Sequence, residues 1–412
     1  MKNRLSDILK TNHLWLAAAL VLVALSLEIN AQKVLQLPTP AGEGSGQSFL
    51  TTGRDGRVYL SWIERLENKR FALRFSAKER DGWSRPQTIA EGGDWVVNWA
   101  NFPSIVALPD GSLAAHWLTS GGGGPYTSDI RISRSFDGGR TWSPGVVPHR
   151  DGTQTEHGFV SMFPGARGAL EAIWLDGREM KKEAGGHGHG HGEMTLRHTS
   201  LGRVDAQGAD SLLDARVCEC CQTSAAMTSD GPIVVYRDRS ADEMRDIAIV
   251  RLGRDGRWSA PRLVHADGWK LDGCPINGPS VDAANRRVAV AWFTMAGGAP
   301  HVRVAFSKDA GATFGAPVKA DDGDPVGRVD VLALEDGGAI VSWIEKTKEG
   351  SAELRVRRVW ADGRRGESVT VAPSGEARSS GFPQMARSKN SLIFSWTGTS
   401  RVLTAETTVP AR

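Results

Sequence analysis

The chain has 412 residues, and its 50 lysines and arginines nearly balance its 47 aspartates and glutamates, so the formal net charge is only +3. No basic stretch is interleaved with aromatic residues, which argues against a nucleic-acid-binding protein. Glycine is abundant at 48 residues, and tryptophan at 14 far exceeds tyrosine at 3. This composition indicates many turns and a repeated tryptophan packing position.

The first 31 residues have the pattern of an export signal. Three basic residues precede an apolar stretch at 14–27, and residues 29–31 form an acceptable cleavage site. The stretch is shorter than the ~20 apolar residues that span a bilayer. We therefore expect a signal peptide over 1–31 and a periplasmic or secreted mature chain, 32–412, with no stable membrane span after processing. An uncleaved N-terminal anchor is the alternative.

One short pattern recurs along the mature chain. An apolar stretch closed by tryptophan, or once by tyrosine, follows a glycine-rich turn. The copies are Val58–Trp62, Leu113–Trp117, Leu170–Trp174, Ile233–Tyr236, Val288–Trp292, Ala339–Trp343 and Leu392–Trp396. Successive aromatic positions are 51 to 62 residues apart. A regular interval of this size predicts a repeat architecture.

Each repeat has the pattern of four antiparallel strands. Asp-Gly turns such as Asp55-Gly56 and Asp110-Gly111 connect alternating apolar stretches, and these residues tolerate the positive φ of a hairpin turn. No stretch after residue 31 has helical periodicity. Repeated four-stranded antiparallel units of this length are typical of the blades of a β-propeller, so we predict an all-β fold.

The two ends of the chain determine the expected number of blades. The seventh unit ends with the strand 402–408 and lacks a fourth strand, whereas 33–37 is an isolated strand before the first unit. Pairing these two strands closes the ring and removes two exposed edges. We therefore predict a seven-bladed β-propeller of four-stranded antiparallel blades, closed by the N-terminal strand. Six blades are the alternative.

Two segments match the eight-residue pattern S-x-D-x-G-x-[TS]-[WF], the Asp box. Their matching residues are Ser135, Asp137, Gly139, Thr141 and Trp142, and then Ser307, Asp309, Gly311, Thr313 and Phe314. Both boxes fall between the third and fourth strands of a unit, where the aspartate can accept hydrogen bonds from the turn backbone. Over most of 32–412 the chain resembles the sialidase superfamily of Asp-box (BNR repeat) propellers. The boxes support the fold and carry no reaction.

The resemblance implies a particular catalytic chemistry. Sialidases bind the substrate carboxylate with three arginines and use a tyrosine nucleophile backed by glutamate, with an aspartate as acid/base. The family's Phe-Arg-x-Pro signature would fall near Asn101-Phe-Pro-Ser104, where no arginine stands, and the family enzymes usually have six blades. The candidates that remain are Tyr236, Asp238, Arg237, Arg239 and Arg328.

These candidates leave enzyme activity open. Tyr236 occupies the tryptophan position of its repeat, which favours a packed ring over a nucleophile. Arg237, Asp238 and Arg239 could contact a ligand or form a solvated ion-pair cluster. An enzyme of this kind would be a sialidase-like glycoside hydrolase acting on acidic glycans.

The repeat places all four cysteines on one face. The top face is the end of the propeller at which the chain enters the innermost strand of each blade. Cys218, Cys220 and Cys221 precede the innermost strand of the fourth unit, and Cys274 precedes that of the fifth. The same face carries His157 and the glycine-spaced His187, His189 and His191. Thiolates with imidazoles suit Cu(I) or Zn(II).

Several interpretations of this cluster remain. Four cysteines in an oxidising compartment can form two disulfides in three connectivities, and a short histidine-rich tract binds metal by composition alone. Neighbouring Cys220 and Cys221 point in different directions on an extended backbone, so we expect one disulfide, from Cys218 or Cys220 to Cys274, beside a Cys/His metal site.

We therefore expect an exported propeller that binds a transition metal, preferably copper, on its top face. Its other expected partners are a small ligand, a glycan or an exported protein. A glycoside hydrolase and an interaction scaffold stapled by disulfides are the alternative functions.

Overall fold

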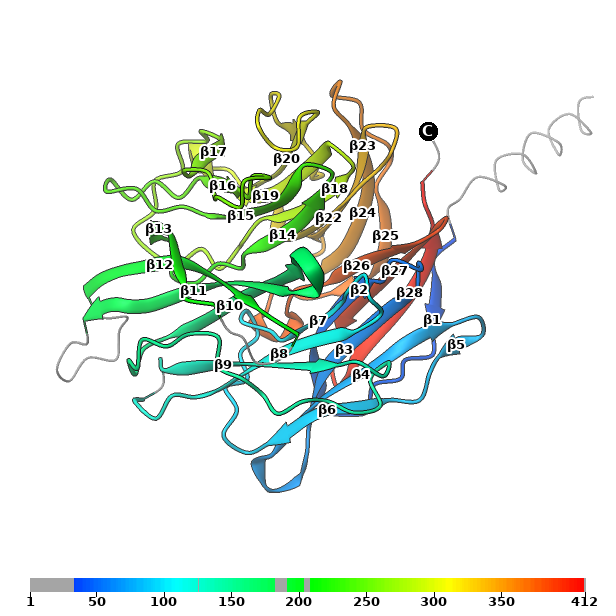
Figure 1. Ribbon diagram of the computed structural model, residues 1–412. Helices are drawn as coiled ribbons and strands as arrows, with labels where there is room; N and C mark the ends of the chain where they lie inside the picture. Colours follow the sequence, from blue (N-terminus) through cyan, green and yellow to red (C-terminus); the bar gives the residue numbers. More distant parts are fainter. Residues whose placement is uncertain (1–32, 125, 182–190, 204–207, 411–412) are drawn as a thin grey trace, which may run out of the picture.

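The computed structural model describes residues 33–124, 126–181, 191–203 and 208–410. Seven antiparallel sheets surround a common axis and form a seven-bladed β-propeller (Figure 1). Apart from strands, these residues contain only four short 3-10 helices. None of the helices in the described part of the chain is long and apolar enough to cross a membrane. The predicted signal peptide, 1–31, lies outside the described residues.

The first strand of each blade faces the axis, and these strands contact one another in a ring. They are β2 (Ser45–Thr52), β7 (Ser104–Ala107), β10 (His157–Pro164), β14 (Ser224–Thr228), β18 (Ser280–Ala284), β22 (Pro325–Ala333) and β26 (Gln384–Ser388). The second strands are β3 (Val58–Arg65), β8 (Leu113–Ser120), β11 (Leu170–Lys181), β15 (Gly231–Arg237), β19 (Arg287–Thr294), β23 (Gly338–Lys346) and β27 (Ser391–Thr397).

The outer strands complete the blades. The third strands are β4 (Phe71–Glu79), β9 (Ser128–Ser135), β12 (His191–Leu201), β16 (Ile247–Arg251), β20 (His301–Ser307), β24 (Ala352–Trp360) and β28 (Val402–Thr408). The fourth strands are β6 (Gln87–Gly92), β13 (Ser211–Val217), β17 (Arg262–His265), β21 (Val318–Lys319), β25 (Val369–Ser374) and β1 (Leu35–Leu37), with the short β5 (Gly82–Trp83) as an addition to the first blade.

The N-terminal strand closes the ring as predicted. Strand β1 pairs antiparallel with β28, with Leu35 opposite Glu406 and Leu37 opposite Thr404. In Figure 1 this strand, in blue, lies beside the red C-terminal strand. The last blade therefore combines the two ends of the described chain.

The second blade departs from the four-stranded pattern. Its sheet contains only β7, β8 and β9, and the expected fourth strand is reduced to a bridge between Val146 and Ile132. Pro144 and Pro148 flank this bridge, and each lacks the N–H that would extend a ladder. The prolines explain why pairing stops after one residue.

A buried aromatic ring ends the apolar stretch of most second strands, and a carboxylate accepts a hydrogen bond from its polar atom. The rings are at most 1% exposed. The pairs are Trp62 with Glu64 at 3.3 Å, Trp174 with Asp176 at 2.7 Å, Tyr236 with Asp214 at 2.6 Å, Trp292 with Asp267 at 2.6 Å and Trp343 with Glu345 at 2.5 Å. Tyr236 thus occupies a packing position, as the repeat predicts.

The segments 135–142 and 307–314 form turns with one hydrogen-bond pattern. Asp137 accepts the N–H and the hydroxyl of Thr141 at 2.9 and 2.7 Å, and Asp309 accepts the same groups of Thr313 at the same distances. Gly139 has φ +91°, and a Cβ there would lie 2.2 Å from the ring of Phe75 in the neighbouring blade. These turns follow third strands, at the end of the propeller opposite the cysteines.

Removing β1 should destabilise the ring, because it exposes the edge of β28 and removes its backbone hydrogen bonds, each of which contributes roughly 1 kcal/mol. We expect a chain that begins at Pro38 to melt at least ~2 °C below a chain that begins at Gln32. Thermal unfolding followed by circular dichroism measures the difference. Equal melting temperatures would contradict closure by this strand.

Candidate functional site

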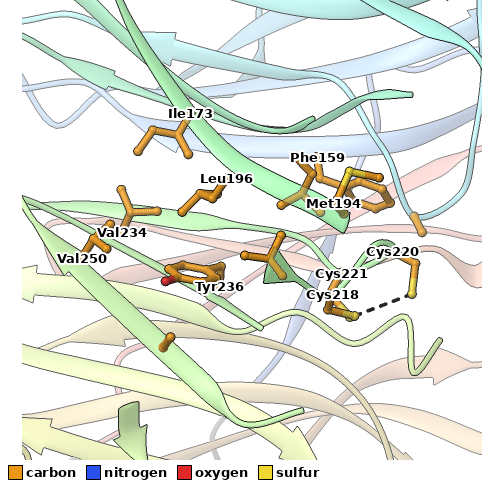
Figure 2. Close-up of a cluster of buried hydrophobic side chains, with 14 of the residues drawn as sticks. Phe159, Ile173, Met194, Leu196, Cys218, Cys220, Cys221, Val234, Tyr236 and Val250 are labelled. Carbon is orange, nitrogen blue, oxygen red and sulfur yellow. Dashed lines mark hydrogen bonds between the residues drawn. The ribbon is translucent and has the colours of Figure 1, made fainter. Parts of the chain in front are cut away.

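The four cysteines lie on the top face, in the segments that lead into β14 and β18. Cys220 and Cys274 form a disulfide that joins these two segments. This is one of the two pairings expected from the sequence. Cys218 and Cys221 are free thiols. Figure 2 shows them side by side, with Cys220 across from them, at the end of a buried apolar cluster that includes Tyr236.

The free thiols form a close, buried pair. The Sγ atoms of Cys218 and Cys221 lie 3.0 Å apart, and each residue is 1% exposed. The Sγ of Cys218 also lies 3.9 Å from that of Cys220, whereas Cys274, at the other end of the disulfide, is exposed. The site is therefore a buried dithiol next to a disulfide that reaches the surface.

The surroundings favour a negative charge on Cys221. Burial opposes ionisation of this thiol, but the hydrogen bond from Cys218, the charge of Arg237 and the backbone N–H of Asn277 outweigh it and lower the pKa of Cys221. Burial and the neighbouring Cys221 raise the pKa of Cys218. Of the two thiols, Cys221 is therefore the one that ionises more readily, and Cys218 is placed to donate its S–H to it.

Arg237 supplies a buried positive charge beside this thiolate. The residue is 1% exposed, and its guanidinium donates to the carbonyl oxygens of Asn277, Arg245 and Phe293 and lies 4.8 Å from the ring of Trp269. Within the described residues it forms no salt bridge. A buried cation needs a compensating charge, and the Cys221 thiolate is placed to provide it.

An ion-pair network covers the cysteines. Arg245 donates to Glu219 and to Glu243 at 2.8 Å each, and Arg239 pairs with the same two carboxylates. Glu219 stands between Cys218 and Cys220 in the sequence, so the network holds the cysteine segment from outside. Arg239 is thus a member of an ion-pair cluster, one of the two roles considered for it.

The remaining catalytic candidates lie in two places: Tyr236 and Asp238 are both beside Asp214, whereas Arg328 is elsewhere. The ring of Tyr236 is fully buried, and burial together with Asp214 raises the pKa of its hydroxyl strongly. Burial and Asp214 also raise the pKa of Asp238, to about 6. Arg328 is 4% exposed and donates to the backbone carbonyls of Glu376 and Gly381. Like Arg237, it holds backbone segments together.

His157 lies with a second group of side chains, apart from the cysteines. Its ring stacks on that of His149 at 3.7 Å, its Nε2 is 3.2 Å from Asp151 and 3.7 Å from Asp176, and its Nδ1 faces the carbonyl of Ser128 at 3.1 Å. The histidine loop was expected close by. His187 and His189 lie outside the described residues, and His191 begins β12 with no description of its side chain.

The two stacked histidines have opposite charge preferences. Burial disfavours the charge of His157, but hydrogen bonding to Asp151 and the charge of Asp176 prevail and raise its pKa. Burial and the neighbouring His157 lower the pKa of His149 to about 4. Of the two rings, His157 is therefore the one that takes up a proton more readily.

Sequence reasoning missed most of this second group, namely His149, Asp151 and Asp176. One signal was available for Asp176. The spacing Trp174-x-Asp176 repeats Trp62-x-Glu64 and Trp343-x-Glu345, so the repeat itself marks a carboxylate two residues after the buried ring.

A channel of about 340 Å³ follows the propeller axis and is lined by residues from all seven blades. Aromatic rings surround one part of it: Phe102 packs against Phe49 and Phe382, and Trp99 stacks on Phe382 at 5.7 Å. Arg328 lies over Trp99 at 5.0 Å. The cysteines do not line this channel, although Phe159 and Phe382 belong both to its lining and to the apolar cluster that contains the cysteines. The channel offers apolar faces to a small molecule.

Comparison with known proteins identifies the fold of the chain but does not establish its activity. No protein-family model and no curated protein matches the chain. The lectin BP39L of Burkholderia pseudomallei superposes with a TM-score of 0.60 at 12% identity, over 90% of this chain and 97% of the lectin. A protein of unknown function from Dyadobacter fermentans gives 0.52 at 14% identity, over 92% and 98%.

The endosialidase of phage phi92 gives a TM-score of 0.50 at 9% identity, over 93% of this chain and 70% of the enzyme. Identities this low establish a shared architecture and leave activity undetermined. In fold, the chain is a sialidase-like β-propeller with a cysteine cluster on its top face.

The depressed pKa of His149 predicts a loss of stability in acid. The unfolded chain takes up this proton near pH 6.5 and the folded chain only near pH 4, so stability falls as the pH drops through this window, by ~2–3 kcal/mol. We expect His149→Gln to remove this loss, as measured by urea unfolding at pH 7.5 and 4.5. His265→Gln, at a partly exposed position, serves as the control. The same pH dependence in His149→Gln and wild type would contradict the assignment.

We expect no appreciable hydrolysis of a fluorogenic sialoside, because Tyr236 is buried against Asp214 and the arginines Arg237 and Arg328 are engaged with backbone carbonyls. Continuous fluorescence at several pH values measures the activity. Turnover that disappears in Tyr236→Phe would overturn this interpretation.

Proposed function

We propose that this protein is an exported metal-binding propeller that holds one Cu(I) ion between the thiolates of Cys218 and Cys221. The observation that carries the proposal is the pair of buried free thiols 3.0 Å apart. Thiolates are the ligands that soft Cu(I) prefers. Two such ligands come from one short segment whose backbone is held by a rigid scaffold.

The number of available ligands favours copper over zinc. A structural zinc ion takes four ligands. Here Cys220 is engaged in a disulfide, and the group of possible ligands around Cys218 and Cys221 contains no histidine or carboxylate among the described residues. Cu(I) is satisfied by few soft ligands, so it matches a two-thiolate site better.

Charge also supports a monovalent ion. Two thiolates with one Cu(I) carry a net charge of −1, and the buried guanidinium of Arg237 offsets this charge. If the bonds were as long as a zinc–thiolate bond, about 2.3 Å, a linear arrangement would separate the sulfurs by ~4.6 Å. Binding therefore requires one cysteine side chain to rotate away from the 3.0 Å contact.

Two independent features support the proposal that the protein is exported. The first 31 residues have the pattern of a signal peptide, and the Cys220–Cys274 disulfide is typical of a protein in an oxidising compartment. A buried dithiol in such a compartment benefits from a bound metal, because coordination protects thiolates from oxidation.

A second candidate function is the binding of a small ligand or glycan in the axial channel. The observation that favours it is the set of aromatic rings around Phe102 and Phe382, since flat apolar faces of this kind can stack against a ligand. Tyr236, the candidate nucleophile of the glycoside-hydrolase alternative, is buried against Asp214 and does not line this channel.

Titration with Cu(I) tests the copper proposal. We expect the chain 32–412, in a background with His187, His189 and His191 replaced by alanine, to bind one Cu(I) in competition with a chromogenic Cu(I) chelator. Cys218→Ser and Cys221→Ser should each weaken binding by at least ~100-fold, because a single thiolate remains.

The matched control is His157→Ala, which should retain one tightly bound Cu(I) because His157 belongs to the separate Asp151–Asp176 group. Unchanged copper binding in both cysteine variants, or loss of binding in His157→Ala with the fold intact, would overturn the assignment.

A further inference from the structure

We propose that the four cysteines form an internal thiol–disulfide exchange relay, in which the disulfide moves from Cys220–Cys274 to Cys218–Cys221. The relay shares Cys218 and Cys221 with the proposed copper site but requires no metal. It follows from the placement of two free thiols beside a disulfide, one end of which is buried and the other exposed.

The first step joins Cys218 to Cys220. Cys218 gives its proton to the Cys221 thiolate, to which it already donates a hydrogen bond. The resulting Cys218 thiolate attacks the Sγ of Cys220, 3.9 Å away. A Cys218–Cys220 bond forms, the Cys220–Cys274 bond breaks, and Cys274 leaves as a thiolate. Because Cys274 is exposed, water solvates the departing charge, which makes it the better leaving group of the two disulfide sulfurs.

The second step completes the transfer. Cys221 loses its proton to solvent and the Cys274 thiolate takes one up, so the proton count is unchanged. The Cys221 thiolate then attacks the Sγ of Cys218, which lies 3.0 Å away in the starting state. The Cys218–Cys221 bond forms and Cys220 leaves as a thiolate. One disulfide, one thiol and one thiolate exist before and after, so no external oxidant or reductant takes part.

The local sequence is compatible both with the starting disulfide, Cys220–Cys274, and with the product disulfide, Cys218–Cys221. The spacing Cys218-x-x-Cys221 is that of a redox-active dithiol motif. The starting disulfide ties the lead-in of the fourth blade to that of the fifth, whereas the product disulfide lies within a single segment. Movement of the disulfide therefore releases the segment around Cys274 and presents that thiol at the surface.

The relay links the surface to the buried site. In the starting state the two buried thiols are available to copper. In the product state they are oxidised to each other, and the exposed Cys274 is available to a thiol or disulfide from outside. Exchange and copper binding are thus mutually exclusive states of the same four residues.

Trapping by N-ethylmaleimide under native conditions tests the relay. Metal-free chain 32–412 is incubated with the reagent at pH 7.5, digested without reduction and mapped by mass spectrometry. We expect label on Cys274 together with a Cys218–Cys221 disulfide. In Cys221→Ser, Cys218 must lose its proton to solvent instead, so labelling of Cys274 should be slower than in wild type, and the relay should stop after its first step with a Cys218–Cys220 disulfide.

The matched control is Cys218→Ser, which cannot begin the relay, so labelling of Cys274 should be at least ~10-fold slower. Circular dichroism checks that each variant is folded. An unlabelled Cys274 in native wild type, or equal labelling rates in wild type and folded Cys218→Ser, would overturn the relay. A rate that rises with protein concentration would also overturn it, because it indicates exchange between molecules.

Labelling of Cys274 in the presence of one equivalent of Cu(I) distinguishes failure of the relay from failure of the proposed copper site. If both are correct, copper suppresses the labelling of Cys274. Labelling that is fast without copper and unchanged with it supports the relay and contradicts the copper site.

Discussion

A buried aromatic ring whose polar atom is satisfied by a carboxylate is the interaction on which this propeller depends. Trp62, Trp174, Trp292 and Trp343 each follow this rule, and Tyr236 substitutes in the fourth blade. Truncation of such a ring typically costs 3–5 kcal/mol, and an orphaned buried donor costs a further 1–3 kcal/mol. The ring and its carboxylate therefore act as a unit that stabilises each of these five blades.

The same unit places charge on the top face. Arginines on the third strands stand opposite the tryptophans, as Arg74 does for Trp62 and Arg303 for Trp292. These arginines pair with the carboxylates that accept from the rings, Arg74 with Glu64 at 3.1 Å and Arg303 with Asp267 at 2.5 Å. Packing inside the blades thus leads directly to an ordered polar layer above them.

The cysteine site depends on this rigid frame. The segment that carries Cys218, Cys220 and Cys221 is held from below by the apolar cluster around Tyr236, from outside by the Glu219 ion pairs, and sideways by the disulfide to Cys274. Arg237 lies at the end of β15 and is fixed by three backbone carbonyls. A buried pair of thiols next to a fixed, buried cation is therefore a property of the fold.

The sequence was sufficient for the architecture because the architecture is periodic. The recurring aromatic position predicted the blades, and the isolated strand 33–37 predicted how the ring closes. The fourth strand of the second blade was harder to predict, because a single proline on each side of Val146 decides how far pairing extends.

The site was predictable only in part. Blade order places all four cysteines on one face of adjacent blades, and the disulfide to Cys274 followed within two alternatives. A shared face does not determine which side chains touch, so His157 was grouped with the cysteines although it lies with His149 and Asp151. The burial of Arg237 could not be predicted from the sequence, because arginine is usually exposed. Its role in holding backbone segments together follows only from its hydrogen bonds to the carbonyls of Asn277, Arg245 and Phe293.

X-ray absorption at the copper edge is the most direct test of the central claim, that the two buried thiols are a copper site. Wild-type protein loaded with one Cu(I) should show only sulfur neighbours, two per copper. A spectrum dominated by nitrogen neighbours from imidazole would place the metal at histidines and contradict the account.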